Sequence, residues 1–192
     1  MNYYFFAASL PALSLESAPS LTAVDFVAQC EEHLSPADLE GIRTILQSEG
    51  SDDAEPEQIR MHPFVADWQE RDTDLRNAIV RERAGRTGRD AARYLHEQAG
   101  FDSYRQRAVS DAFSRGDPLQ TELALDRLRW HEIEELEGAD TFASNAILGY
   151  ALKLQMATRW SKLDAEQGMA RLDKTAADLA QPGEANEAKV TQ

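Results

Sequence analysis

The chain is 192 residues long, which is enough to bury a hydrophobic core in one domain or in two small ones. Its formal net charge of −14 repels phosphate backbones, so we expect no nucleic acid among its partners. Residues 1–59 contain eleven acidic residues and one arginine, whereas residues 60–130 contain thirteen arginines and twelve acidic residues. The middle of the chain therefore either pairs its arginines with acids along solvated helices or presents an arginine-rich face to an acidic partner.

The single cysteine, Cys30, excludes an intrachain disulfide framework and a cysteine-based metal site. It shares its spacing with apolar residues such as Phe26 and Leu34, which predicts a small buried side chain and not a nucleophile. This cysteine usage fits a reducing cytoplasm.

The N-terminal segment is apolar over residues 3–15, but it lacks a positively charged start and Pro11 interrupts it, so we do not expect a signal peptide. No stretch is long and apolar enough to span a bilayer; the most apolar candidate, residues 142–156, contains Asn145 and Lys153. We therefore expect no direct insertion into a membrane.

The beginning of the chain is ambiguous and then becomes helical. Residues 3–8 are too few for periodicity to separate a short buried strand from the first turn of a helix. Prolines and serines over residues 11–19 predict an extended connector. Thr22 is a suitable N-cap and is followed by an acid in the first turn, which predicts a helix over residues 23–33.

Two further helices are expected on either side of a polar segment. Ser35-Pro36 places a cap before a proline at the first helical position and predicts a helix that ends near Gly50. Residues 51–57 are polar and acidic, so they predict a surface loop or a linker. Pro63 then begins a long helix with one apolar stripe, made of Phe64, Trp68, Leu75 and Ile79.

The helical pattern weakens in the middle of the chain. Gly85 and Gly88 are expected to break or kink the long helix. Residues 89–99 are compatible with another helix, and residues 101–114 carry a weaker helical pattern.

The clearest helix start in the sequence is Asp117-Pro118, where a capping side chain precedes a proline at the first helical position. This helix is expected to stop by Gly138. Residues 140–141 are expected to start the next one, whose apolar residues over 142–163 occur on most sides. A helix of that kind lies at the centre of its domain.

Together these elements predict an all-α fold, a multi-helix bundle whose N-terminus is either helical or a short strand or extended segment. We expect a single helical domain over residues 1–180, or two parts that meet at residues 51–63. A short helix is expected after Asp164. Residues 181–192 are small, polar and charged, which predicts a disordered tail.

The sequence contains no residue set typical of catalysis, a cofactor or a metal. His131 and Glu135 share a helix face, and with Glu134 they are the one candidate for a metal-dependent enzyme site; a local hydrogen bond on a polar face is the favoured interpretation. Residues 85–89 resemble a phosphate cradle but lack the Gly-Lys-Ser/Thr ending of a phosphate-binding loop, so a helix connection is favoured.

The arginine-rich segment is the candidate partner-binding surface. Guanidinium groups are suited to grip the carboxylates of an acidic partner. The five arginines of this candidate surface are Arg76, Arg81, Arg83, Arg86 and Arg89.

Several segments occur in a characteristic order. They are the opening Tyr-Tyr-Phe-Phe-Ala-Ala-Ser-Leu-Pro-x-Leu at residues 3–13, then Leu75-Arg76-Asn77 and Arg83-Ala84, and a series of later blocks. These blocks are Asp117-Pro118-Leu119, Glu122, Asp126, Arg129-Trp130, Glu134-Glu135-Leu136, Phe142, Tyr150, Lys153-Leu154-Gln155, Arg159-Trp160, Leu163-Asp164 and Gly168. In this order they resemble a bacterial family of uncharacterised proteins encoded in V-type (V/A-type) ATPase operons. The resemblance covers most of residues 1–172. The opening is also similar to the start of a funnel-shaped subunit of V-type ATPases. This subunit is called C in bacteria and d in eukaryotes, and is written C/d below.

The resemblance implies a non-catalytic cytoplasmic subunit or accessory protein of a bacterial V-type ATPase, peripheral to the inner membrane through the complex. The C/d subunit joins the central stalk to the membrane rotor ring, so stalk and rotor-ring subunits are the implied partners in proton or sodium transport. The chain is far shorter than a full C/d subunit, and the alternative is a transient helical adaptor or ATPase assembly factor. The family supplies no catalytic residue, and an enzyme is the least favoured hypothesis.

Overall fold

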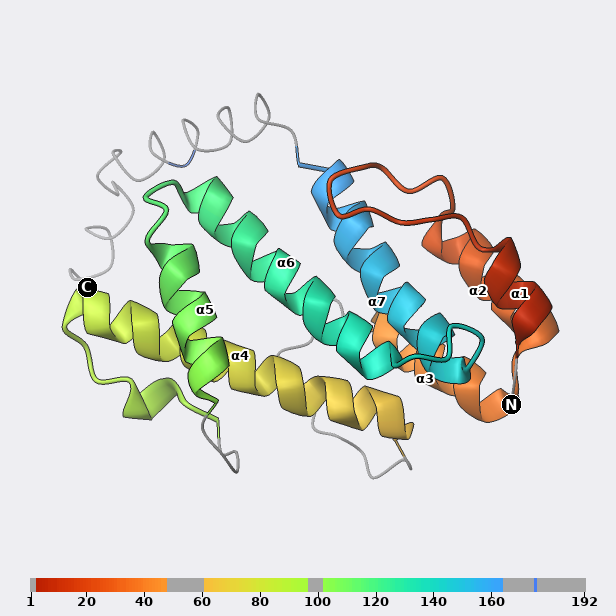
Figure 1. Ribbon diagram of the computed structural model, residues 1–192, viewed down its shortest axis with the longest axis horizontal. Helices are drawn as coiled ribbons and strands as arrows, with labels where there is room; N and C mark the ends of the chain where they lie inside the picture. Colours follow the sequence, from red (N-terminus) through yellow and green to blue (C-terminus); the bar gives the residue numbers. More distant parts are fainter. Residues whose placement is uncertain (1–2, 48–60, 97–101, 164–174, 176–192) are drawn as a thin grey trace, which may run out of the picture.

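The computed structural model describes residues 3–47, 61–96, 102–163 and 175 of the chain (Figure 1). Within these residues the fold is all-α, as the sequence predicts, with seven α-helices and one 3₁₀ turn. In chain order the elements are α1 (Tyr4–Ser9), α2 (Ala23–His33), α3 (Pro36–Gln47), α4 (Pro63–Thr87), the 3₁₀ turn η1 (Ala92–Tyr94), α5 (Ser103–Phe113), α6 (Pro118–Glu137) and α7 (Ser144–Ser161).

Helix α7 lies at the centre of the bundle, as its apolar residues predict. It contacts α2, α3, α4 and α6, whereas α5 packs against α4 and α6 towards one end of the molecule (Figure 1). Its buried residues are Ile147, Leu148, Gly149, Ala151, Leu152, Leu154, Met156 and Ala157. A helix buried on so many sides is held by its neighbours more than by its own propensity.

The buried apolar side chains form two clusters in the described part of the chain. The large cluster joins α1, α2, α3 and α7 with one end of α4 and the C-terminal half of α6. The small cluster lies where α5 packs against α4 and α6, and consists of Leu75, Ala78, Ile79, Val109, Ala112 and Leu125. Helices α4 and α6 contribute to both clusters and therefore connect them.

Cys30 belongs to the large cluster and is 0 % exposed. Burial raises the pKa of its thiol to about 12. The prediction of a small buried side chain at this position is confirmed.

The opening segment is helical, so the strand alternative for residues 3–8 is wrong. The backbone N–H of Tyr3 donates to the carbonyl of Phe142 (2.8 Å), which ties the beginning of the chain to the segment before α7. Tyr3 and Phe6 are buried, whereas Tyr4 and Phe5 are 54 % and 87 % exposed. A strand would place alternate side chains on one face, whereas one helical turn brings Tyr3 and Phe6 to the core together.

Local capping signals place two of the helix starts, as the sequence predicts. The hydroxyl of Thr22 accepts a hydrogen bond from the backbone N–H of Asp25 (3.1 Å) at the start of α2. The carboxylate of Asp117 accepts one from the backbone N–H of Leu119 (3.1 Å) at the start of α6. Each bond satisfies an N–H group in the first turn, where the helix itself offers no acceptor.

Helix α4 is longer than the glycines predict. It continues through Gly85 and ends at Thr87, and Gly88 then adopts the left-handed conformation of a C-cap, with φ of 65°. Residues 85–89 are therefore the last turn and the cap of a helix. Carbonyl groups face outward at this end, so its polarity is opposite to that of a phosphate-binding helix N-terminus.

The α-helix expected over residues 89–99 is wrong for the part that is described, where only η1 forms. The side chain of Asn77 in α4 pairs with the backbone of His96: its Oδ1 accepts from His96 N (2.9 Å) and its Nδ2 donates to His96 O (3.0 Å). These backbone groups are thus bonded across to α4 and not along a helix. Residues 97–99 lie outside the described residues.

Helix α7 begins at Ser144 and not at residues 140–141. The carboxylate of Asp140 accepts from the backbone N–H of Phe142 (3.0 Å), which forms a local turn before the helix. The cap-like sequence at Asp140 is therefore a turn signal.

Other predictions fall outside the described residues: the linker over residues 51–57, the short helix after Asp164 and the tail at 181–192. The domain boundaries therefore stay a prediction. No helix among the described residues combines the length and the apolar character that crossing a membrane requires.

Candidate functional site

The five arginines of the predicted partner-binding surface fall in different places on α4 and just beyond it. Arg76 lines a groove together with arginines of α6 and α7. Arg83 and Arg86 lie over the ring of Phe113 in α5, with guanidinium carbons 5.8 and 5.4 Å from the ring centroid. Arg81 is half-buried, and Arg89 is exposed after the C-cap.

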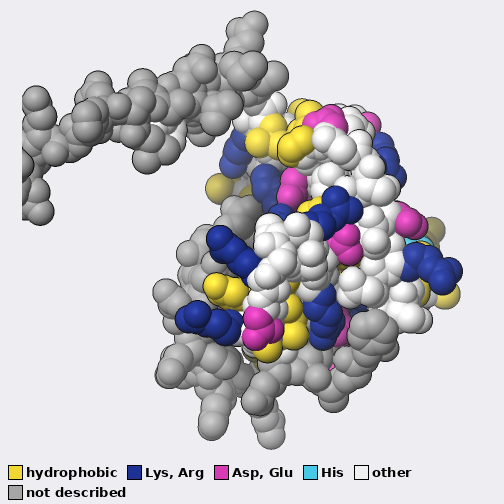
Figure 2. Space-filling view, turned by 90° about the vertical axis from the view of Figure 1, so that its left-hand side faces the viewer, with side chains coloured by type: hydrophobic (Ala, Val, Ile, Leu, Met, Phe, Trp, Pro, Cys, Tyr) yellow, Lys and Arg dark blue, Asp and Glu magenta, His cyan; other side chains and the backbone are white. Residues whose placement is uncertain are grey.

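The arginines at the C-terminal end of α4 have acidic partners. Arg83 is 3.3 Å from the carboxylate of Glu122 in α6, and Arg86 is 2.8 Å from that of Glu82 one turn earlier. Figure 2 shows basic, acidic and apolar side chains mixed over this end of the molecule. Both residues therefore form ion pairs, which is one of the two alternatives for this segment. Their side chains are also exposed, so the other alternative, binding of an acidic partner, stays a prediction.

Helix α6 carries a carboxylate, Asp126, that is 0 % exposed. It accepts hydrogen bonds from Arg129 Nη1 (2.8 Å), from Arg159 Nη2 and from Trp160 Nε1 (2.7 Å). Arg129 also donates through Nε to Asp72 of α4 (3.3 Å). One buried acid thus gathers donors from α6 and α7, and Arg129 extends the cluster to α4.

The carboxylates of this cluster favour the charged state of Arg129. Burial disfavours the guanidinium cation of Arg129, but the carboxylates of Asp72 and Asp126 outweigh this effect and raise its pKa above the ordinary value. A buried carboxylate is costly unless several donors compensate its lost hydration. The cluster therefore fixes how α4, α6 and α7 lie relative to one another.

A groove of about 240 Å³ lies on the outer side of this cluster, between α4, α6 and α7. Its described lining combines three arginines and one acid with apolar and amide groups: Trp68, Asp72, Arg76, Arg129, Leu152, Gln155, Met156 and Arg159. Asp72 is shared between two of the arginines, since Arg76 Nε also lies 2.7 Å from its carboxylate.

A second buried acid, Glu132, makes a similar connection between α4, α5 and α6. Arg105 of α5 binds its carboxylate with two N–H groups (2.8 and 2.9 Å), and Arg71 of α4 adds a third contact (2.9 Å). Arg105 also pairs with Asp74 of α4 (2.8 Å). Burial alone would raise the pKa of Glu132, but the hydrogen bonds from Arg105 and Arg71 hold it below the ordinary value.

A third buried acid, Asp38 in α3, lies beside a histidine and two hydroxyl groups. Tyr3 OH (2.6 Å), Ser35 Oγ (2.6 Å) and His62 Nε2 (3.1 Å) contact its carboxylate. His62 Nδ1 meanwhile accepts from the backbone N–H of Phe64 and caps α4. Both ring nitrogens of the histidine are therefore occupied, and neither bonds to the serine, so the group lacks the nucleophile-to-base contact of a catalytic triad.

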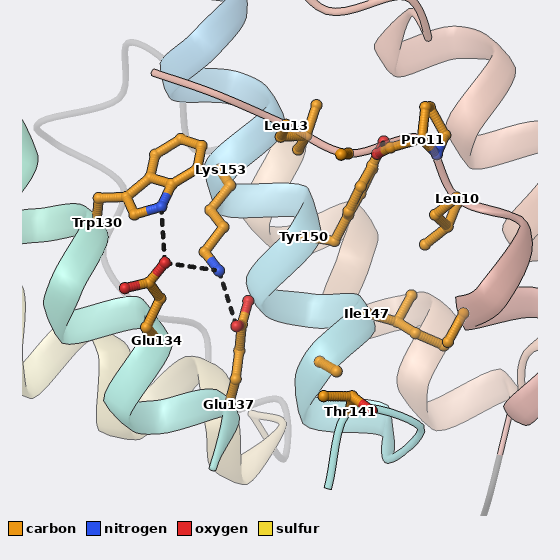
Figure 3. Close-up of a pocket in the computed structure, with 13 residues that line it drawn as sticks. Leu10, Pro11, Leu13, Trp130, Glu134, Glu137, Thr141, Ile147, Tyr150 and Lys153 are labelled. Carbon is orange, nitrogen blue, oxygen red and sulfur yellow. Dashed lines mark hydrogen bonds and ion pairs between the residues drawn. The ribbon is translucent and has the colours of Figure 1, made fainter. Parts of the chain in front are cut away.

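A pocket of about 290 Å³ lies between α6, α7 and the segment after α1 (Figure 3). Figure 3 shows Lys153 of α7 pointing at Glu137, 2.8 Å away, with Glu134 on its other side at 3.8 Å. Its ammonium also lies 5.5 Å from the centroid of the Trp130 ring. Because this ammonium is already held by an acid and an aromatic ring, the pair serves to connect α6 to α7.

His131, Glu134 and Glu135 do not converge on one point. His131 Nε2 lies 3.5 Å from Glu135 on the exposed face of α6, whereas Glu134 accepts from Trp130 Nε1 (3.0 Å) and faces Lys153. The local pair on a polar face, which the sequence favours, is what the structure contains.

The sequence does not predict the convergence of Asp126, Arg129 and Arg159. Asp126 lies four residues before Trp130 and seven before Ile133, on a face of α6 that turns inward. A single acid on an apolar helix face is a signal for a buried charge that must be paired. Its partner from α7, however, is far away in the sequence.

Comparison with known proteins gives one result. A family described as "Protein of unknown function (DUF2764)" has a model that matches residues 103–177. The matched range includes α5, α6 and α7, and thus Asp126, Arg129 and Arg159. No curated protein and no solved structure gives a significant match.

Proposed function

We propose that this chain is a non-catalytic subunit or accessory protein of a bacterial V-type ATPase, with a role like that of the C/d subunit between the central stalk and the membrane rotor ring. The complex would hold it at the cytoplasmic side of the inner membrane. The proposal rests on the resemblance carried by the opening segment and by the blocks of α4, α6 and α7.

The observation that carries the proposal is the division of the opening aromatic motif. Tyr3 and Phe6 serve the fold, whereas Tyr4 and Phe5 are largely exposed. The ring of Tyr4 lies 5.5 Å from that of Phe5 and 4.4 Å from that of Phe142, so the exposed aromatics form a patch. Exposed aromatic patches are typical of protein–protein interfaces.

The three buried acids support a mechanical role for the body behind this patch. Asp126 and Glu132 each accept hydrogen bonds from another helix, and Asp38 of α3 is bonded to Tyr3 and His62, the residues that directly precede α1 and α4. A body that transmits force between two partners must keep its helices in register, and compensated buried charges are sensitive to displacement.

The test is affinity purification of the chain from its native membranes in mild detergent, with the stoichiometry of the co-purified proteins measured. We expect ATPase stalk or rotor-ring subunits in equal molar amounts. Substoichiometric recovery would favour the transient assembly factor. Recovery without any ATPase subunit would refute the proposal.

The same experiment tests the aromatic patch with a matched control. Replacing Tyr4 and Phe5 with serine removes apolar surface that the core does not use, so we expect the fold to persist and the ATPase subunits to be lost. Val24→Ser removes an exposed apolar side chain, 79 % exposed, from the start of α2 and outside the blocks that carry the resemblance. If the double variant and the control recover equal amounts of the ATPase subunits, the patch has no role in binding them.

The arginine surface is tested by charge reversal. We expect the triple variant Arg81→Glu, Arg83→Glu, Arg86→Glu to reduce co-purification while its circular dichroism spectrum stays that of the folded protein. Arg83 and Arg86 are exposed, and the half-buried Arg81 belongs to neither hydrophobic cluster. Arg43→Glu reverses an exposed arginine on α3 and serves as the control. Unchanged recovery of ATPase subunits with the triple variant would show that this surface is not used.

A further inference from the structure

We propose that the groove between α4, α6 and α7 is a binding site for a carboxylate attached to a small apolar group. Its recognition elements are Arg76, Arg129 and Arg159, with Trp68 as part of the wall. The groove shares Arg76 with the candidate partner-binding surface, but the inference rests on the lining of the groove and not on the proposed ATPase role.

The groove gathers cationic side chains in a strongly acidic protein. Its described lining holds three arginines and one acid, Asp72, which lies between Arg76 and Arg129. Behind the lining, Asp126 is shared by Arg129 and Arg159. Guanidinium groups therefore outnumber carboxylates among the described residues of the groove and its base, which favours the entry of an anion.

The arginines are held in place before any ligand arrives. The side chain of Arg129 is 20 % exposed and is fixed at Nε by Asp72 and at Nη1 by Asp126. Arg159 is anchored to the same buried acid through Nη2, yet its side chain is 54 % exposed. Each guanidinium has five N–H donors, so these anchors leave donors for a carboxylate, the partner that its fork geometry suits best.

The rest of the lining selects for an apolar group beside the anion. Trp68, Leu152 and Met156 provide apolar surface, and the side chain of Gln155 is fixed by a hydrogen bond from Nε2 to the carbonyl of Ile45 (3.0 Å). The volume of about 240 Å³ is below the range of roughly 300–1,000 Å³ that holds drug-sized ligands. The groove therefore suits a side chain or a small organic acid, and not a nucleotide.

Two sources can supply this chemistry: a free small carboxylic acid, or an acidic residue beside an apolar one on a partner protein. Both present a carboxylate within a few bonds of an apolar group. They differ in whether the flanking peptide adds to the affinity.

The experiment is an NMR titration of the ¹⁵N-labelled full-length chain with 3-phenylpropionate. The indole N–H signals of the three tryptophans report separately, because Trp130 and Trp160 donate to Glu134 and Asp126 while Trp68 lines the groove. Trp68→Phe identifies the Trp68 signal. We expect a saturable shift of this signal with the acid and none with 3-phenylpropanamide, its neutral analogue.

Two variants test the arginines without removing the anchor of the cluster. Arg76→Gln removes the outermost guanidinium, whose side chain is 59 % exposed, and Arg159→Lys keeps the charge beside Asp126 but loses the fork. We expect each to weaken the binding of 3-phenylpropionate at least tenfold, whereas Arg43→Gln, on α3, leaves it unchanged. Equal shifts with acid and amide, no shift at millimolar acid, or equal affinity in the arginine variants would overturn the proposal.

The two sources are separated by a second titration. Acetyl-Phe-Glu-amide presents the carboxylate on a peptide, and acetyl-Phe-Gln-amide is its neutral control. Tighter binding of the Glu peptide than of 3-phenylpropionate assigns the site to a partner's acidic residue. Tighter binding of the free acid assigns it to a small molecule, and failure of both carboxylates to bind refutes the site.

Discussion

At the scale of single residues, the molecule depends on acids that are buried and fully compensated. Asp126, Glu132 and Asp38 each accept at least three hydrogen bonds from side chains on other turns or helices. An intact group of this kind adds little to the free energy of unfolding. Removing one member lowers that free energy strongly, because a buried charge is left without a partner.

The first prediction concerns Asp126→Asn. The amide has the same shape but no charge, so Arg129 and Arg159 lose the anion that anchors them. We expect the free energy of unfolding, from urea denaturation, to fall by about 3–5 kcal/mol. Glu122→Gln is the control, since that acid forms an exposed pair with Arg83 and its loss should cost no more than ~1 kcal/mol. Equal effects of the two substitutions would contradict the role given to Asp126.

The second prediction concerns acid stability. Burial favours the neutral form of Asp38, but hydrogen bonds from Ser35, Tyr3 and His62 outweigh it and lower its pKa below the ordinary value of 3.8. At this residue the native state therefore binds fewer protons than the unfolded chain. The stabilisation that Asp38 contributes is complete at pH values above its ordinary pKa, and it is lost as the pH falls through that pKa towards the lowered pKa of the native state.

We expect the free energy of unfolding, measured by denaturation at a series of pH values, to decline below pH about 4, the ordinary pKa of an aspartate. Asp38→Asn should flatten that decline, whereas Glu40→Gln, which changes an exposed acid of the same helix, should not. Glu132 acts in the same direction because its pKa is also lowered. A steep acid decline that persists unchanged in Asp38→Asn would rule out Asp38 as its source.

At the scale of the helices, local signals are sufficient where the structure depends on local chemistry. Thr22 and Asp117 cap the helices that they precede, and Pro63 begins α4. The helix predicted after Gly88 is wrong, because the side chain of Asn77 takes the backbone groups of His96. A bond between residues so far apart in the sequence leaves no local trace.

The same limit applies to the candidate site. The density of arginines along the sequence points to the five of the candidate surface, but it does not show which acid each one faces. Arg76 of α4 lies in the same groove as Arg129 of α6 and Arg159 of α7 because these three helices pack together. The convergence is a product of helix packing, so the residue types can be predicted from the sequence and their partners cannot.

The third prediction concerns two glycines within helices. A Cβ at Gly149 of α7 would lie 2.2 Å from Oε1 of Glu137, whereas a Cβ at Gly85 of α4 would meet nothing within 4 Å. Gly149→Ala must therefore displace the acid that holds Lys153, and we expect a loss of about 1–3 kcal/mol in the free energy of unfolding despite the better helix propensity of alanine.

Gly85→Ala gains the propensity without the clash, so we expect it to raise the free energy of unfolding by roughly 0.5–1 kcal/mol. Urea denaturation measures both variants. Stabilisation by Gly149→Ala would mean that Glu137 moves aside freely and that its pair with Lys153 contributes nothing.

At the scale of the whole molecule, the two hydrophobic clusters share two helices. Phe64 and Leu75 of α4 belong to the large and the small cluster respectively, and Ile133 and Leu125 of α6 divide in the same way. Unfolding of the small cluster would expose part of both helices and would break the connection at Glu132. We therefore expect the described helices to unfold as one cooperative unit, as a single domain does.

The fourth prediction tests this with Leu75→Ala in the small cluster. The leucine is 1 % exposed, and its truncation should cost about 2–5 kcal/mol. All three tryptophans pack against the large cluster, so tryptophan fluorescence reports on that cluster alone, whereas far-ultraviolet circular dichroism reports on all helices. If the clusters are coupled, both signals shift to the same lower denaturant midpoint, while Tyr104→Ala, at an exposed position of α5, moves neither.

An early step in circular dichroism with an unchanged fluorescence midpoint would instead mean that the end formed by α5 unfolds separately. Force could then not be transmitted through that end of the molecule as through a rigid body.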